Sequence, residues 1–268
     1  MKLSALLIAA GMILSNIASA ADKDAAKDAK AERPLTPGGV WHMGDKARPK
    51  PRVIDPGKPE DCEGPARAPS DAIVLIGNGD LSAFQMRPRG KKGAALTDPT
   101  WKIDGDFVEV VPNSGDLLSN EKFGDCQIHV EWATSYEPMG KGQARGNSGV
   151  LLPGHVELQI LDSYENETYA DGQAAAIYHR YPPLVNASRK PGEWQTFDIM
   201  FLAPRFDDKD AKKIVTPARV TVLHNGILVH HDAETGGTSA ETQIVLQDHL
   251  TPVRFRNVWV RRLKGYDE

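Results

Sequence analysis

The chain has 268 residues, of which 40% are hydrophobic and 25% are charged, and its formal net charge is −4 at pH 7. This length suits one large sandwich or two small domains. The mildly acidic balance argues against nucleic acid as a partner, because binding to phosphates needs a concentrated basic surface.

The start of the chain predicts a secretory signal peptide over residues 1–20. Lys2 supplies a positive charge, residues 3–17 are mainly apolar, and Ala18-Ser19-Ala20 forms a small-x-small cleavage signal. The apolar stretch is too short for a membrane span, and no second long apolar run follows it. We therefore expect a soluble protein of the periplasm or of the medium beyond it, without membrane insertion.

Residues 21–70 are expected to precede the folded domain as a flexible segment. Residues 21–33 are almost all Ala, Lys, Asp and Glu, so they offer no apolar face and predict a tether. From Pro34 to Pro69, frequent Pro and Gly predict an extended stretch that wraps the domain or reaches to it. The two cysteines, Cys62 and Cys126, allow either a disulfide bond in an oxidising compartment or two unpaired thiols with Cys126 buried.

The folded domain is expected to span residues 71–268 and to be all-β. Short runs of alternating apolar and polar residues are separated by turn residues, which is typical of a sandwich or a barrel. Asp104-Gly105 and Asn225-Gly226 predict two hairpin turns. Because no long helical period and no internal repeat occurs, we expect one domain.

The strand from His155 to Asp162 carries the most informative polar residues. Alternation divides it into a core face and an opposite face, with Val156, Leu158 and Ile160 on the first and His155, Glu157 and Gln159 on the second. Asp162 breaks the pattern, so either the strand ends at Leu161 or a bulge turns Asp162 onto the polar face. The bulged form would set two carboxylates and an amide in a row, which suits a sugar-processing site.

This strand and the short motifs around it point to a family. Its pattern E-x-Q-x-x-D is similar to the E-x-D-x-x-E strand of laminarinase-type jelly-roll glycosidases, but it differs at two of three positions, so their double-displacement mechanism is not carried over whole. The other motifs are, in chain order, Ile76-Gly77-Asn78-Gly79-Asp80-Leu81-Ser82, Asn147-Ser148-Gly149-Val150, Ala176-Ile177-Tyr178, Pro191-Gly192-Glu193-Trp194-Gln195, His224-Asn225-Gly226, Ile244-Val245-Leu246-Gln247-Asp248-His249 and Val253-Arg254-Phe255-Arg256-Asn257-Val258. In this order, over about Ala72 to Leu263, the chain resembles the 3-keto-disaccharide hydrolase domain family. Gln195 stands where that family usually has Asn, and Leu250 where it usually has Gly.

The resemblance implies a two-sheet antiparallel jelly-roll sandwich of the concanavalin A-like type that acts on glycosides oxidised to a ketone at C3. A 3-ketone acidifies the C2 hydrogen, so a base can remove it and the C1 substituent can leave by elimination. Water then adds to the enone, and the sum is hydrolysis. This route needs a general base, an acid for the leaving oxygen and a group that stabilises the enolate. Direct displacement, as in a glycosidase, is the alternative route.

The family context gives each polar residue an expected role. Glu157 is the expected base or metal ligand, with Asp162 as its partner, and His249 is an expected acid or ligand, with His179 as a second candidate. The expected substrate contacts are Gln159, Asn147, Ser148, Tyr178, His179, Trp194, Arg254 and Arg256. One of the two arginines would hold the ketone or enolate oxygen. For each of these residues the alternative is a structural role in a turn, in loop packing or on a solvated edge.

No cofactor is predicted with certainty. No Gly-rich loop joins a strand to a helix, so a nucleotide cofactor is not supported, and no Cys-x-x-Cys pair suggests structural zinc. A divalent ion such as Ca, Mn or Mg, held by oxygen ligands with or without one His, stays open. The expected partner is a small-molecule carbohydrate, and the sequence does not predict an oligomeric state.

Two other functions fit the same pattern. A non-catalytic carbohydrate-binding jelly roll would keep Trp194 and the polar face without needing a carboxylate pair. Replacing Glu157 with Gln separates it from an enzyme, because a binding module would keep most of its affinity. An envelope scaffold would instead use residues 34–69 as an arm that binds a partner.

Overall fold

The computed structural model describes residues 33–37, 39–53, 68–90 and 93–264. The predicted signal peptide, the predicted tether up to residue 32 and Cys62 lie outside the described residues. The described residues from Arg33 onward form one compact unit. No helix in the described part of the chain is both long and apolar enough to cross a membrane.

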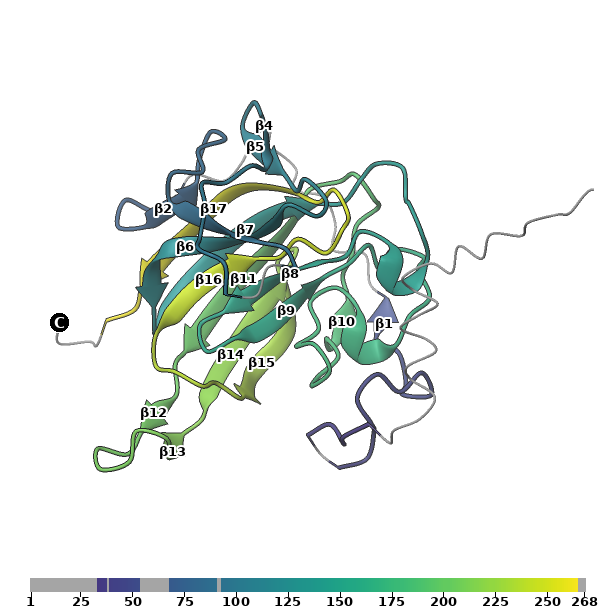
Figure 1. The fold of residues 1–268 in the computed structure, drawn as a ribbon. Coiled ribbons are helices and arrows are strands. Elements are labelled where there is room, and N and C mark those ends of the chain that lie inside the picture. Colours follow the sequence, from purple (N-terminus) through teal and green to yellow (C-terminus); the bar gives the residue numbers. More distant parts are fainter. Residues whose placement is uncertain (1–32, 38, 54–67, 91–92, 265–268) are drawn as a thin grey trace, which may run out of the picture. The chain divides into compact units, whose positions relative to one another are not determined.

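Two antiparallel sheets form the domain and pack face to face, which confirms the predicted all-β sandwich (Figure 1). The larger sheet has the order β15 (Ile227–Thr235), β14 (Ala218–His224), β11 (Gln195–Leu202), β7 (Cys126–Ala133), β17 (Arg254–Arg262), β5 (Phe107–Glu109) and β4 (Lys102–Asp104), and β2 (Ile73–Ile76) also pairs with β17. The five-stranded sheet has the order β3 (Phe84–Pro88), β6 (Gly115–Phe123), β16 (Thr242–Leu246), β8 (Ser148–Leu152) and β9 (Val156–Ile160).

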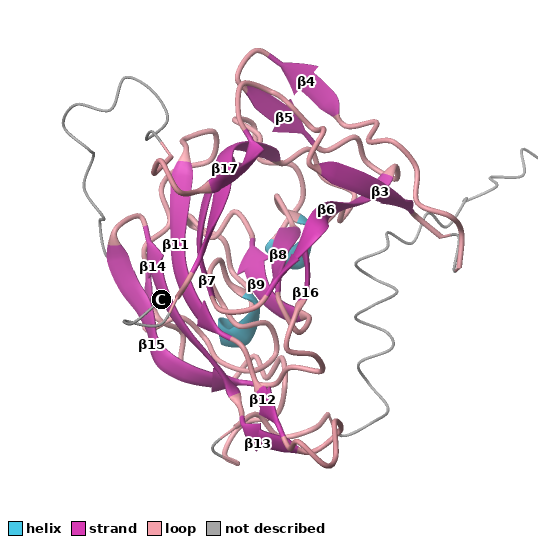
Figure 2. Ribbon diagram, turned by 90° about the vertical axis from the view of Figure 1, so that its left-hand side faces the viewer, coloured by secondary structure: helices cyan, strands magenta, loops and turns pink. Residues whose placement is uncertain are grey.

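Short elements complete the fold. Two small two-stranded pairs join β1 (Arg52–Val53) with β10 (Val185–Asn186) and β12 (Arg205–Phe206) with β13 (Ile214–Thr216). Two short 3-10 helices, Gly142–Ala144 and Ala170–Gly172, are the helical elements of the described residues. Figure 2 shows how strands make up nearly all of the regular structure.

The core lies between the two sheets and follows the predicted alternation. In β11, Phe197, Ile199 and Phe201 are fully buried, and Trp132 of β7 packs against Phe197 with 5.3 Å between ring centroids. Burying one such side chain stabilises the fold by about 2 kcal/mol. From the smaller sheet, β9 contributes the predicted inward residues, so the Glu157 side of that strand faces away from the core.

Two predicted hairpins are present, each with glycine at a position that needs it. Asn225 and Gly226 both have positive φ angles between β14 and β15, as a tight hairpin turn requires. Gly105 has φ +61° between β4 and β5. Glycine adopts these positive φ angles without the steric penalty that a residue with a side chain would meet there.

The last strand occupies the middle of the larger sheet. One edge of β17 pairs with β7 over most of its length, while its other edge pairs with β5 near its start and with β2 near its end. Its register against β7 shifts between Arg256 and Trp259, where Asn257 has a positive φ angle, so the strand carries a bulge there.

Cys126 is a free, fully buried cysteine at the start of β7. Burial raises the pKa of its thiol to about 12, so it stays protonated and unreactive at neutral pH.

Candidate functional site

The outer face of the five-stranded sheet carries a row of polar residues from separate strands. The register sets Arg87 of β3 opposite Asp116 of β6. It sets Gln247, just after β16, next to Asp116, and the Gln247 backbone N–H donates to the Gly149 carbonyl of β8. Gly149 in turn pairs with Gln159 of β9. Neighbours of these residues point into the core, so the row faces away from it.

Glu157 lies beside this row, in the space that a glycine leaves open. A Cβ on Gly149 would stand 2.8 Å from Glu157 Oε1, so only glycine admits the carboxylate at this point of the sheet. Gln247 Nε2 donates to the same oxygen at 3.4 Å. Burial raises the pKa of Glu157 to about 7, with the Asp116 charge adding to the rise and the Gln247 hydrogen bond opposing it. A carboxyl group with this pKa can take up and release a proton near neutral pH.

Asp116 is the second carboxylate of this face. It accepts a hydrogen bond from the Asp248 backbone N–H at 2.9 Å and lies 4.0 Å from Arg87 Nη1. Burial raises the pKa of its carboxyl group above the ordinary value. Asp248 is fully buried and accepts backbone hydrogen bonds from Gly115 and Leu250, so it fixes the turn on which the exposed His249 stands.

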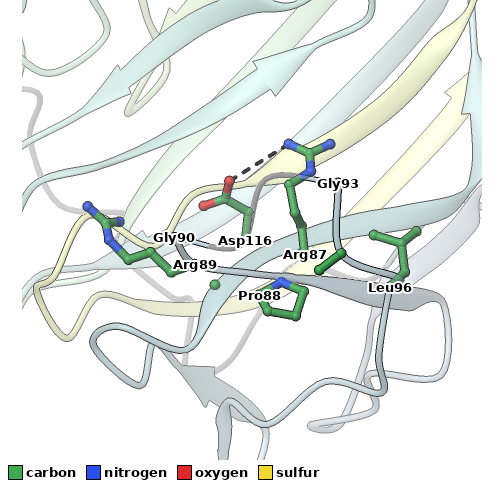
Figure 3. A pocket seen from close by; sticks show the side chains of 9 residues that line it. Arg87, Pro88, Arg89, Gly90, Gly93, Leu96 and Asp116 are labelled. Atoms are coloured by element: carbon green, nitrogen blue, oxygen red, sulfur yellow. Dashed lines mark ion pairs between the residues drawn. The ribbon is translucent and has the colours of Figure 1, made fainter.

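A cavity of ≈ 580 Å³ opens at the end of this sheet, beside Asp116 (Figure 3). Its lining includes Arg87, Arg89, Leu96 and Asp116, and Figure 3 shows the Arg87 and Asp116 side chains directed toward one another. The volume falls in the range of small-molecule sites and provides charged, polar and apolar contacts together.

Tyr178 approaches Glu157 from the loop after β9. Its backbone N–H donates to the Glu157 carbonyl at 3.0 Å, and its hydroxyl shares a hydrogen bond of 2.6 Å with Tyr169. The His179 ring stacks on the Tyr178 ring with 4.0 Å between centroids. Burial raises the pKa of Tyr178, and the Glu157 charge raises it further, so the phenol is protonated at neutral pH and can donate a hydrogen bond.

Gln159, Asn147 and Ser148 lie close to this face and make internal contacts. Gln159 Nε2 donates to Gln143 Oε1 at 3.2 Å and to Asn147 Oδ1 at 3.3 Å. Ser148 Oγ donates to the Gln247 carbonyl at 2.7 Å. These bonds fix the backbone that carries Gln247 and the loop before β8.

Asp162 does not lie in a row with Glu157. Strand β9 ends at Ile160 and its register with β8 is continuous, so the structure shows no bulge that would turn Asp162 onto the polar face. The Asp162 side chain is buried and forms an ion pair with Arg145 Nε at 2.7 Å. The expected pairing of Glu157 with Asp162 is therefore absent, because Arg145 takes up the buried carboxylate.

Trp194, Arg254 and Arg256 lie on the outer face of the other sheet. Phe255 faces the core, so the arginines on either side of it point away from the core and from the Glu157 face. The Arg256 guanidinium lies 4.1 Å from the Trp194 ring centroid, and Arg254 lies over the same ring at 5.6 Å. The structure therefore brings these three residues together, but not with Glu157.

Ion pairs hold this far face together. Arg256 Nε binds Glu131 Oε2 at 2.7 Å, and His129 Nδ1 binds Asp198 Oδ1 at 2.7 Å. Burial alone would raise the pKa of Glu131, but the His129 ring 3.6 Å away and the hydrogen bonds from Asn257 and Arg256 outweigh it and hold the pKa at about 2. Burial would lower the pKa of His129, but its two carboxylate partners raise it to about 9.

Three residues of the Glu157 face were not predicted as site residues: Asp116, Arg87 and Gln247. Gln247 stood within a motif quoted for the family, and Asp116 follows the turn Pro112–Gly115 at the start of a strand. The sequence places Gln247 and Asp116 near strand ends, but it does not show which neighbouring strands bring them close to Glu157.

A metal centre finds no support in the side-chain geometry. Among the described residues, no group of three or more His, Cys, Asp or Glu is placed to hold a metal ion. We derive no step of the reaction through a divalent ion.

Comparisons with known proteins agree with this architecture. The family described as a 3-keto-alpha-glucoside-1,2-lyase-like domain matches residues 71–261. A crystal structure from Parabacteroides distasonis ATCC 8503, of a protein provisionally named a glycosyl hydrolase, is 36% identical, with a TM-score of 0.68, and the match covers 86% of this chain and 100% of that chain. Two further proteins of this organism with the same provisional name share the fold at 16% and 18% identity, with TM-scores of 0.54 and 0.51; each match covers 72% of this chain, and 94% and 99% of theirs. No curated protein sequence matches.

Proposed function

Because the chain belongs to the family of 3-keto-α-glucoside 1,2-lyase-like domains, we propose that it cleaves glycosides that carry a ketone at C3. The family membership and its similarity to proteins named as glycosyl hydrolases support a carbohydrate-acting, hydrolase-like role. The reaction site is the outer face of the five-stranded sheet around Glu157.

Glu157 is the general base of the proposed reaction. In its ionised form it takes the hydrogen from C2, and the C2–H electron pair forms a double bond to C1 while the bond from C1 to the leaving oxygen breaks. The neighbouring ketone makes this proton transfer feasible, because negative charge moves onto the C3 oxygen. Water then adds at C1 and a proton returns to C2, so the sum is hydrolysis. The observation that carries this proposal is the carboxyl group held over Gly149 with Gln247 as its hydrogen-bond donor, where burial raises the pKa of Glu157 to about 7.

Three neighbouring groups supply the other functions of the reaction. Tyr178 is protonated at neutral pH and donates a hydrogen bond to the oxygen that develops charge. Asp116 lines the cavity beside Arg87 and is the proposed proton donor to the leaving oxygen; burial raises its pKa above the ordinary value. Gln247 orients the Glu157 carboxylate through its hydrogen bond.

Purified protein incubated with a 3-keto-disaccharide, and in parallel with the unoxidised disaccharide, tests the proposal. We expect turnover of the ketone only, with free aglycone sugar as a product. Equal turnover of both sugars would refute the ketone requirement, and no turnover of either would refute the proposal. If Glu157→Gln bound the keto sugar and the wild type bound it without cleaving it, the chain would be a binding module.

We also propose that the protein is exported to the periplasm or beyond. Lys2, the apolar residues 3–17 and Ala18-Ser19-Ala20 support this location. The mature protein recovered from the periplasmic fraction should begin at Ala21 by N-terminal sequencing. A cytoplasmic product that begins at Met1 would contradict export.

A further inference from the structure

We propose that the segment 33–53, which precedes the part of the chain matched to the family, completes the site through Arg33, a positioning residue that holds Tyr178 beside Glu157. This inference rests on the proposed function and deepens it. The family match begins at residue 71, so this segment contributes a group that the matched domain does not itself supply.

The segment is attached to the loop that carries the site tyrosines. Strand β1 pairs in parallel with β10, directly after that loop (Figure 1). Lys50 Nζ binds Glu167 Oε1 at 3.0 Å at the surface. Deeper in, the Gly44 backbone N–H donates to Oδ2 of the fully buried Asp171 at 3.0 Å. A bond to a buried carboxylate is the kind that fixes position, since breaking it leaves a costly buried charge.

Arg33 lies over Gly44 and next to His179. Its Nη1 donates to the Met43 carbonyl at 3.3 Å, and its own carbonyl accepts a hydrogen bond from His42 Nδ1. A Cβ on Gly44 would overlap Arg33 Nη1 and stand 3.5 Å from His179 Nε2. The guanidinium therefore occupies the space that the missing side chain leaves, facing the imidazole.

His179 and Tyr169 transmit this position to Tyr178. The His179 backbone N–H donates to the Asp171 carbonyl at 3.0 Å, and the His179 ring covers the Tyr178 ring. Tyr169 contacts both rings and binds the Tyr178 hydroxyl. His179 has a φ of 57°, an unfavourable value for a non-glycine residue that surrounding contacts must maintain.

The charges around the phenol give Arg33 a second effect. Tyr178 is faced by Tyr169, His179, the Glu157 and Asp171 carboxylates and the Arg33 guanidinium. Burial is the largest cause that raises the pKa of Tyr178, and the Glu157 and Asp171 charges raise it further. The Tyr169 hydrogen bond and the Arg33 charge lower it. The positive charge of Arg33 therefore offsets the two carboxylates beside the Tyr178 hydroxyl, which must donate a hydrogen bond to the substrate.

Two glycines of the segment provide a matched pair of variants. Gly39 and Gly44 have φ angles of +67° and +70°, so an alanine meets the same backbone penalty at either position. Only Gly44 lies under Arg33, because nothing lies within 4 Å of a Cβ on Gly39. Gly44→Ala therefore displaces the guanidinium without removing its charge, while Gly39→Ala controls for strain in the segment.

The first measurement needs no substrate. Burial lowers the pKa of His179, the Asp171 charge raises it and Arg33 lowers it. The His179 pKa, followed by NMR of the imidazole C–H signals and assigned with His179→Gln, should rise in Arg33→Met and in Gly44→Ala and stay unchanged in Gly39→Ala. An unchanged His179 pKa in Arg33→Met would overturn the placement of Arg33.

The second measurement is steady-state kinetics on the 3-keto-disaccharide. Arg33→Met and Gly44→Ala should lower kcat about tenfold, with a smaller change in KM, because a misplaced hydrogen-bond donor is felt mostly in the transition state. Arg33→Lys should recover part of the loss, and Gly39→Ala should match the wild type. If Glu157→Gln were inactive while Arg33→Met kept full kcat, this inference alone would fail. A fully active Glu157→Gln, or a wild type that leaves the ketone intact, would overturn the proposed function and this inference with it.

Discussion

Replacing Glu157 with Gln should remove activity and yet stabilise the protein. Glutamine keeps the size of the side chain and its contact with Gln247, but it cannot accept a proton from C2. General-base catalysis contributes about 10²- to 10⁴-fold, so kcat should fall by that factor. In the wild type, kcat/KM should fall as the pH drops below about 7, where Glu157 takes up its proton.

The stability effect follows from the same carboxyl group. Its pKa rises from the ordinary value of 4.5 to about 7, because burial disfavours the charge. Since the folded state holds this proton more tightly than the unfolded state, ionisation of Glu157 costs the fold stability as the pH rises from 4.5 through about 7. The full difference corresponds to at most about 3 kcal/mol. Gln carries no such cost, so the variant should be more stable by up to this amount at pH 8, and equally stable at pH 4.

Urea unfolding at pH 4 and pH 8, together with kinetics on the 3-keto-disaccharide, checks both effects. Glu137→Gln, at an exposed position, is the control and should change neither quantity. A Glu157→Gln variant within threefold of the wild-type kcat would refute the role of the base. A variant less stable than the wild type at pH 8 would refute the raised pKa.

Three further changes test separate parts of the structure. Asp162→Asn should lower the free energy of unfolding by about 3 kcal/mol, because it leaves Arg145 without its buried partner, while kcat of the folded fraction stays unchanged in single-turnover assays. Gly149→Ala should lower kcat by about tenfold with little loss of melting temperature, since its Cβ would push the Glu157 carboxylate aside. Glu131→Gln should lower the free energy of unfolding by about 3 kcal/mol at pH 7. The loss should shrink from pH 4.5 down to about 2, where the wild-type carboxylate is itself protonated. Equal losses at pH 7 and pH 2 in urea unfolding would contradict the low pKa.

The sequence alone was sufficient to predict the strands and to predict which of their side chains face the core. Val156, Leu158 and Ile160 are buried as expected, and the hairpin at Asn225-Gly226 has the turn that its residues favour. Both features are local, because period-two alternation and turn preferences act within a few residues. Arg254 and Arg256 share a face for the same reason, as alternation predicts.

The composition of the site depended on which strands become neighbours. Asp116 and Gln247 reach Glu157 only because β6, β16 and β8 lie side by side, and nothing in a single strand states that order. The position of Asp162 likewise depended on Arg145, which arrives from a separate loop and satisfies its charge. In the same way, the sheet that carries the two arginines could not be told from their spacing alone.

The central place of β17 has a consequence for how the chain folds. This strand, Arg254–Arg262, lies between β7 on one side and β5 and β2 on the other, although these three strands are synthesised much earlier. The larger sheet therefore cannot close until nearly the whole chain has been synthesised, and its contacts span long distances in sequence, which is typical of slow folding. Until then, the inner edge of β7 and the edges of β2 and β5 stay open to pairing with other chains. A nonsense mutation that removes only the last strand would thus leave a product prone to aggregation, even though every residue around Glu157 is still present.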